Sequence, residues 1–158
     1  MDVPDTDGVI QAKATLERHM ESLYQEAFEL ANSFFEFTRA MNQNMDWPKK
    51  SSLQLRVRQR GLSLAAEWYD KKWYGSKAKG TRKVFKTYIA KPKGTTGYTL
   101  TKLLGFAQAW EADLVTEVEQ KLTGIRFEAG CVMKALAYLN NAMAKRSGNP
   151  CKDGPRSI

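Results

Sequence analysis

The sequence predicts an α+β protein in which two long helices flank a three-stranded antiparallel sheet. Three observations predict this class. Apolar residues recur with a helical spacing near both ends of the chain, the apolar period changes to two between them, and most of the Lys and Arg residues fall in that middle part. The expected organisation is a single domain with a flexible N-terminus at 1–8, a helix at 9–45, a basic sheet unit at 49–93, a helix at 99–146 and a flexible tail at 147–158.

The N-terminal helix is predicted by an unbroken heptad seam. Its apolar positions are separated alternately by four and three residues, which is the spacing of a coiled-coil face. They are Leu16, Met20, Leu23, Ala27, Leu30, Phe34, Phe37 and Met41. Trp47-Pro48 is expected to stop the helix, because the residue before a proline is pushed out of the helical region.

The C-terminal helix repeats this spacing in its back half, at Val118, Leu122, Ile125, Ala129, Val132, Leu136, Leu139 and Met143. Because the two seams match in length, we expect the helices to pack as an antiparallel, coiled-coil-like hairpin. The front half, from Leu103 to Leu114, is expected to continue the same helix and to pack on the sheet unit.

Aromatic residues lie beside both seams and widen the apolar stripes. They are Tyr24, Phe28, Phe35, Phe127 and Tyr138. A wide stripe on a two-helix hairpin favours a homodimer through the hairpin. The alternative is that these rings thicken the interface within one chain.

Three short segments between the helices alternate with the period of two that is typical of half-buried strands. The first contains Leu53, Leu55 and Val57, the second runs from Leu62 to Trp68 after a turn at Gly61, and the third runs from Val84 to Ile89 after a Gly-rich loop. One face of this meander is apolar and is expected to pack on the front half of the second helix. The other face should carry Arg56, Arg58, Lys86 and Tyr88.

The sheet unit is strongly basic. Residues 49–93 hold 14 of the 25 Lys and Arg residues but only two acids, Glu67 and Asp70, a net charge of +12. Positive charge interleaved with aromatic rings is typical of a nucleic-acid surface. The candidate nucleic-acid-binding residues are Arg56, Arg58, Arg60, Lys71, Lys72, Trp73, Tyr74, Lys77, Lys79, Arg82, Lys83, Lys86, Tyr88, Lys91 and Lys93.

Two kinds of DNA fit this surface. Strand-borne Arg56 and Arg58 would read the base edges of a duplex, while Lys77 and Lys79 in the loop would contact phosphate. Single strands would instead stack on exposed rings, so the exposure of Trp73 and the neighbouring tyrosines discriminates between the two. A third interpretation needs no ligand, since surface strands often carry Lys and Arg to prevent edge pairing.

The sequence predicts no enzyme, no cofactor and no metal site. No Cys and His residues stand at zinc spacing, and the two acids of the basic unit do not form a paired set that would hold magnesium. His19 is expected to be a solvated helix residue, and Cys131 and Cys151 to be free thiols of a cytoplasmic protein. No apolar run is long enough to span a membrane.

Four ordered blocks carry a resemblance to a known family. They are GLSLAAEWYDKKW, KGTRKVFKTYIAKPKG, GYTLTKL and AWEADLVTEVEQ, within residues 51–135. They resemble the MobI-type mobilisation proteins of integrative and conjugative elements. The resemblance implies an auxiliary protein of transfer that acts on double-stranded origin-of-transfer DNA with a separate relaxase, and it implies no catalytic residues. The alternative is a sheet-based DNA- or RNA-binding regulator, or a nucleoid-like protein, without a role in transfer.

Overall fold

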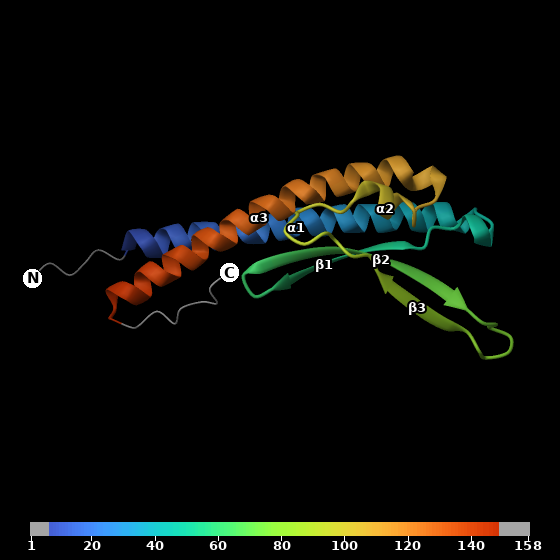
Figure 1. Ribbon diagram of the computed structural model, residues 1–158, viewed down its shortest axis with the longest axis horizontal. Coiled ribbons are helices and arrows are strands. Elements are labelled where there is room, and N and C mark those ends of the chain that lie inside the picture. The colour runs from blue at the N-terminus through green and yellow to red at the C-terminus, as the bar shows by residue number, and fades with distance from the viewer. Residues whose placement is uncertain (1–6, 149–158) are drawn as a thin grey trace, which may run out of the picture.

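The computed structural model describes residues 7–148 and has the predicted α+β class, with two long helices and a three-stranded antiparallel sheet of order β1-β2-β3 (Figure 1). The predicted N-terminal segment up to residue 6, the tail from residue 149 and Cys151 lie outside the described residues. The elements are α1 (Asp7–Gln43), a 3-10 turn (Trp47–Lys49), β1 (Leu53–Arg60), β2 (Ser63–Tyr74), β3 (Lys83–Tyr88), α2 (Leu100–Leu104), a second 3-10 turn (Ala109–Glu111) and α3 (Ala112–Arg146).

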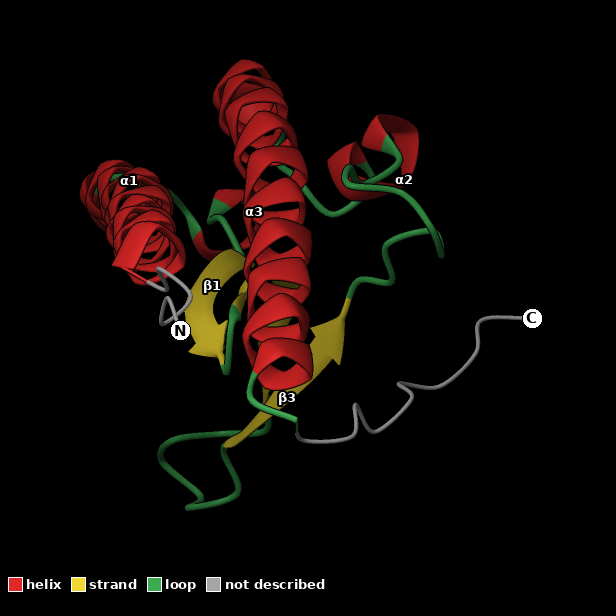
Figure 2. Cartoon of the chain, turned by 90° about the vertical axis from the view of Figure 1, so that its left-hand side faces the viewer, coloured by secondary structure: helices red, strands yellow, loops and turns green. Residues whose placement is uncertain are grey.

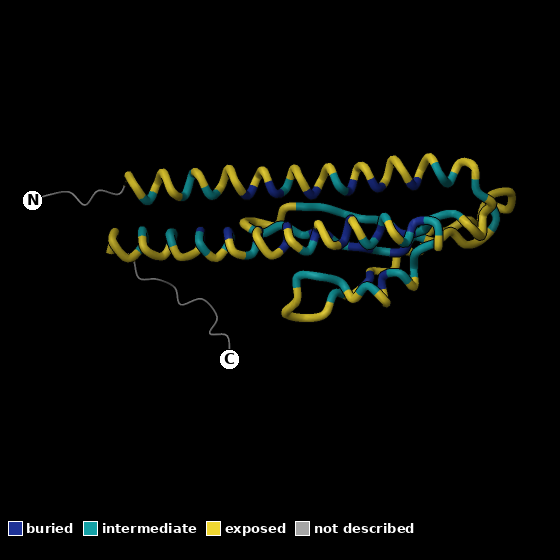
Figure 3. The backbone as a smooth tube through the Cα atoms, turned by 90° about the horizontal axis from the view of Figure 1, so that it is seen from above, coloured by how far each residue is buried: buried dark blue, intermediate teal, exposed yellow. Residues whose placement is uncertain are grey.

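Helices α1 and α3 form the predicted antiparallel hairpin, side by side over most of their length (Figures 1 and 3). Their facing positions are buried at Met20, Leu23, Ala27 and Phe34 of α1 and at Val118, Leu122, Ile125, Ala129, Val132 and Leu136 of α3. The prediction for Phe37 is wrong, because this ring is exposed and Ala31 and Thr38 are buried instead. An α-helix with 3.6 residues per turn drifts away from a strict seven-residue repeat, which explains the change.

The prediction of one continuous helix over 99–146 is wrong at its front. Helix α2 ends at Leu104, and the chain turns through residues 105–108 before the 3-10 turn leads into α3. Gln108 starts the new helical segment through a capping box with Glu111. In this box the backbone N–H of Gln108 donates to Glu111 Oε1 at 3.0 Å. Leu103 and Leu114 therefore lie on two separate helices, α2 and α3, which are joined by a turn of the chain.

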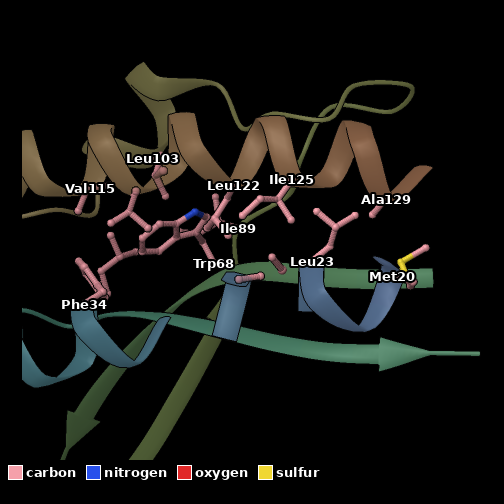
Figure 4. Packing of buried hydrophobic residues seen from close by; sticks show 14 of the residues in the cluster. Met20, Leu23, Phe34, Trp68, Ile89, Leu103, Val115, Leu122, Ile125 and Ala129 are labelled. Atoms are coloured by element: carbon pink, nitrogen blue, oxygen red, sulfur yellow. The ribbon is translucent and has the colours of Figure 1, made fainter. Parts of the chain in front are cut away.

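The sheet packs against both long helices, whereas the sequence predicted that its apolar face packs on the front half of the second helix, with the inner ends of both helices near Met41 and Val118 facing the sheet unit. Strand β1 lies along α1, and β2 contacts α3 (Figure 2). Trp68 of β2 is fully buried between the two helices, and its ring meets that of Phe34 edge-on at a centroid distance of 5.2 Å (Figure 4). Leu103 of α2 is also buried in this core.

A buried polar network joins the sheet to α3. Glu119 accepts a hydrogen bond from Trp68 Nε1 at 2.7 Å and two from the Arg126 guanidinium at 2.8 and 3.1 Å. Arg126 also donates to the backbone carbonyls of Ala66 and Thr96. Since buried charges are tolerated when they are paired and hydrogen-bonded, this network fixes β2 and the segment after β3 against the helix.

Candidate nucleic-acid interface

The second half of β2 and all of β3 form a two-stranded ribbon that diverges from the helix layer (Figure 1). Strand β2 pairs with β1 from Ser63 to Asp70 but with β3 from Tyr69 to Tyr74, so β1 does not flank the ribbon beyond Asp70. Every residue of β3 is exposed. We call residues 69–88, including the connecting loop, the β-arm.

The β-arm is strongly basic. It carries seven Lys and Arg residues and one acid, Asp70. Asp70 is buried and accepts a hydrogen bond from the Ser52 hydroxyl, with Lys72 Nζ 3.6 Å away. The basic residues are Lys71, Lys72, Lys77, Lys79, Arg82, Lys83 and Lys86, all of which the sequence selected as candidates. The structure thus brings ten of the fifteen candidates together on one projecting element, the seven basic residues and Trp73, Tyr74 and Tyr88.

The loop at the tip of the β-arm depends on Gly75. This residue has φ of 85°, and a Cβ atom there would lie 2.3 Å from the carbonyl oxygen of Thr81. Ser76 and Thr81 close the loop, because the Ser76 amide donates to Thr81 Oγ1 and the Thr81 amide donates to the Ser76 carbonyl, both at 3.1 Å. Lys77 and Lys79 are exposed on this closed loop.

Cations and aromatic rings alternate on the face of the sheet that carries the odd-numbered residues of β2. Arg56 lies over the Tyr88 ring at 5.3 Å, and Lys86 lies over the Tyr69 ring at 5.6 Å. Lys71 and Arg82 lie 5.5 and 4.4 Å from the centre of the Trp73 ring. The strand register explains the arrangement, since it places Tyr69 opposite Tyr88 and Lys71 opposite Lys86. We call this the outer face.

Glu67 holds the two arginines that the sequence selected for base reading. Its carboxylate is 2.7 Å from Arg56 Nη2 and 3.3 Å from Arg58 Nη2. Burial raises the pKa of Glu67, but the hydrogen bonds from both arginines outweigh burial and hold the pKa below its ordinary value. The hydrogen bond that Arg56 donates to Glu67 in turn raises the pKa of Arg56. The two guanidinium groups are thus fixed in place, and the three side chains together carry one net positive charge.

Besides Arg56 and Arg58 on β1, three of the predicted site residues lie outside the β-arm. Arg60 lies at the end of β1 that is far from the arm, where it pairs with Ser63. Leu53, at the end of β1 next to the arm, is about 23 Å away at the usual rise per strand residue. Lys91 and Lys93 follow the sheet, and Lys91 Nζ donates to the Thr95 carbonyl.

Sequence reasoning missed Trp47 and Lys50. Trp47 had been interpreted only as a helix stop, but its ring is 59% exposed and has Lys50 Nζ at 5.6 Å and the Arg82 guanidinium at 5.9 Å. An aromatic residue followed by Pro-Lys-Lys was the signal that could have found it. These residues border a cleft of about 750 Å³ at the base of the β-arm.

A helical hairpin that carries a projecting, strongly basic β-arm defines the chain as a small α+β protein with a concentrated positive surface. The family model of the MobI protein matches residues 23–140, and the chain therefore belongs to this family of mobilisation proteins of conjugative transfer. Members act as accessory proteins of mobilisation and are not known enzymes. No curated protein and no solved structure matches the chain.

Within residues 7–148, no helix is both long and apolar enough to cross a membrane. The same residues contain no group of three or more His, Cys, Asp or Glu side chains that could hold a metal ion. Cys131 is a free, exposed thiol.

Proposed function

We propose that this MobI-family protein is a DNA-binding accessory factor that docks on origin-of-transfer DNA in the cytoplasm and helps to assemble or recruit the relaxase. Family membership supports the role in mobilisation. The observation that carries the DNA contact is the β-arm, where seven Lys and Arg residues stand against one buried acid.

A two-stranded ribbon has a width that the major groove of B-DNA admits. Lys77, Lys79 and Lys83 would contact phosphates, which positions the protein without selecting a sequence. Arg56 and Arg58 would form the selective contacts, because a fixed guanidinium fork can bind O6 and N7 of guanine together. Their hydrogen bonds to Glu67 support this role, since the forks are already ordered before the DNA arrives.

Helix α1 supports a division of labour between the two parts of the molecule. It carries exposed acids at Glu17, Glu21, Glu26, Glu29 and Glu36, so its charge is opposite to that of the β-arm. DNA would be repelled from this helix. We assign the contact with the relaxase to α1 for this reason.

The experiment compares two variants that lose the same charge. Lys77, Lys79 and Lys83 are changed to Gln together in the first, and Lys102, Lys134 and Lys145 in the second; all six side chains are exposed. Fluorescence anisotropy measures the affinity for a duplex of the cognate origin region and for a scrambled duplex of equal length.

We expect the β-arm variant to lose roughly tenfold or more in affinity at physiological salt, because three phosphate contacts disappear. The second variant should stay within about threefold of the wild-type protein. Equal losses in both variants would contradict a role for the β-arm, and equal wild-type affinity for origin and scrambled DNA would contradict specific docking at the origin.

A further inference from the structure

The cleft at the base of the β-arm has no role in the duplex contact proposed above. It lies between the end of α1, the Trp47–Lys49 turn, the β-arm and the segment 105–108. Its lining combines aromatic rings, among them Trp47, Trp73 and Tyr74, with three lysines and with side-chain amides. No Asp or Glu residue lines it. The cleft therefore favours an anionic ligand that also has flat, apolar surfaces.

The two tryptophans share one cation. The Arg82 guanidinium lies 4.4 Å from the centre of the Trp73 ring and 5.9 Å from that of Trp47. Both rings remain open to solvent, with exposed fractions of 40% for Trp73 and 59% for Trp47. Exposed rings beside Arg and Lys are the usual platform of proteins that bind single-stranded nucleic acid.

The walls of the cleft are held by hydrogen bonds before any ligand binds. Gln108 Nε2 donates to the carbonyls of Pro48 and Lys50 at 3.2 and 3.1 Å. Trp110 Nε1 donates to the carbonyl of Lys49 at 2.8 Å. These bonds tie the Trp47 turn to the start of the second helical segment, so the ring of Trp47 is presented from a fixed backbone.

Gln54 offers a polar group for recognition. It lines the cleft, and its side-chain amide makes no hydrogen bond to any other residue in the described part of the chain. An amide has two donors and one acceptor, which is the set that a base edge can pair with. The lining thus offers rings for base faces, an amide for a base edge and lysines for phosphates.

We propose that this cleft binds unpaired bases of single-stranded DNA. The proposal rests on the proposed function, because it assumes that the protein acts on origin-of-transfer DNA. In a duplex both faces of a base are covered by its neighbours in the stack, so only unpaired bases can stack on Trp47 and Trp73. The three lysines without any acid complement the phosphates of such a strand.

The test compares a fluorescent 12-nucleotide thymidine strand with an abasic strand of the same length, which has the same phosphates but no bases. The full chain should bind the thymidine strand more tightly. Trp47→Ala should weaken that binding roughly tenfold or more, since stacking on one ring contributes about 1–3 kcal/mol per base. Trp47→Phe should restore most of it, whereas Ile10→Ala, which removes an exposed apolar side chain near the start of α1, should change nothing.

Three results would overturn the proposal. The first is equal affinity of the wild-type protein for the thymidine strand and the abasic strand. The second is a Trp47→Ala variant that binds the thymidine strand as tightly as the wild-type protein does. The third is displacement of the labelled thymidine strand by polyglutamate as readily as by the unlabelled thymidine strand. A ribo-oligonucleotide that binds tenfold tighter would overturn the assignment to DNA. If one of these results is found but the protein still binds origin duplex, only the cleft proposal fails and the proposed function stands. If the protein binds neither duplex nor single-stranded DNA, the proposed function fails as well.

Discussion

The indole Nε1 of Trp68 donates a 2.7 Å hydrogen bond to Oε2 of Glu119, which lies 51 residues further along the chain on α3. Arg126, two turns along the same helix, pairs with that carboxylate and also binds the backbone carbonyl of Ala66. The sheet is therefore oriented on the helix hairpin by a charged pair and an indole, all of them buried. Because β2 continues from Trp68 into the β-arm, the same network sets the direction of the arm.

Changing Arg126 to Met should destabilise the protein by about 3–5 kcal/mol, because the variant leaves the Glu119 carboxylate buried without its partner. Urea unfolding followed by tryptophan fluorescence measures this free energy. The matched control is Lys121→Met, which breaks the exposed pair of Lys121 and Glu117 and should cost less than about 1 kcal/mol. Similar losses in both variants would contradict a structural role for the buried pair.

The helical hairpin could be predicted from the sequence, but the network that holds the sheet on it could not. Val118, Leu122 and Ile125 follow a spacing that only a helix satisfies, so local periodicity was sufficient. Glu119 and Arg126 look like ordinary surface charges of such a helix, and only the position of β2 makes them buried partners. The basic character of the β-arm was visible in the composition, whereas the cleft depends on the fold, which makes Trp47 and Trp73 line the same cavity.

Glu67→Gln should increase the affinity for duplex DNA several-fold and make the slope of log K against log salt steeper by up to about one unit. The reason is that Glu67 neutralises one of the two charges of Arg56 and Arg58, and each additional phosphate contact adds about 0.9 to the slope. Anisotropy titrations at several salt concentrations measure both quantities. Glu29→Gln removes an exposed charge from α1 and should leave the slope unchanged. A weaker affinity of Glu67→Gln would contradict this prediction, because it would mean that the order Glu67 gives to the two arginines matters more for binding than the charge it cancels.

The pH dependence of stability should contain a contribution from Glu111. This side chain is fully buried, and burial raises its pKa above the ordinary value near 4.5, although the hydrogen bond from the backbone N–H of Gln108 acts against the shift. A raised pKa in the folded state means that the contribution of Glu111 is fully present below the pKa of the unfolded chain and is lost as the pH rises through the folded pKa.

The Glu111→Gln variant keeps an oxygen acceptor for the backbone N–H of Gln108, but its side chain cannot ionise. Its free energy of unfolding relative to the wild-type protein should therefore rise between pH 4 and pH 7, as measured by urea unfolding at both values. The comparison isolates Glu111, because Glu67, whose pKa is lowered, titrates identically in both proteins. A constant difference between the two proteins over this range would contradict the raised pKa.

We propose that the hairpin forms a homodimer through its exposed rings. The alternative from the sequence, that these rings thicken the interface within one chain, is wrong for Phe28, Phe35, Phe127 and Tyr138, because all four are exposed. Light scattering of the wild-type protein at tens of micromolar should give the mass of a dimer. Phe28→Ser with Tyr138→Ser should give a folded monomer that binds a half-length site normally and the full origin region more weakly, since a dimer links two DNA-binding surfaces. A wild-type protein that is already monomeric would contradict the dimer.

The salt dependence of binding to origin duplex tests the role of the β-arm most directly. If about five of its basic residues neutralise phosphates, log K against log salt should have a slope near −4.5, from about 0.9 per phosphate. The variant that lacks Lys77, Lys79 and Lys83 should lose up to about 2.7 units of that slope, while the matched Lys102, Lys134 and Lys145 variant should keep it. A wild-type slope shallower than about −2, or equal slopes for the two variants, would contradict DNA binding through the β-arm.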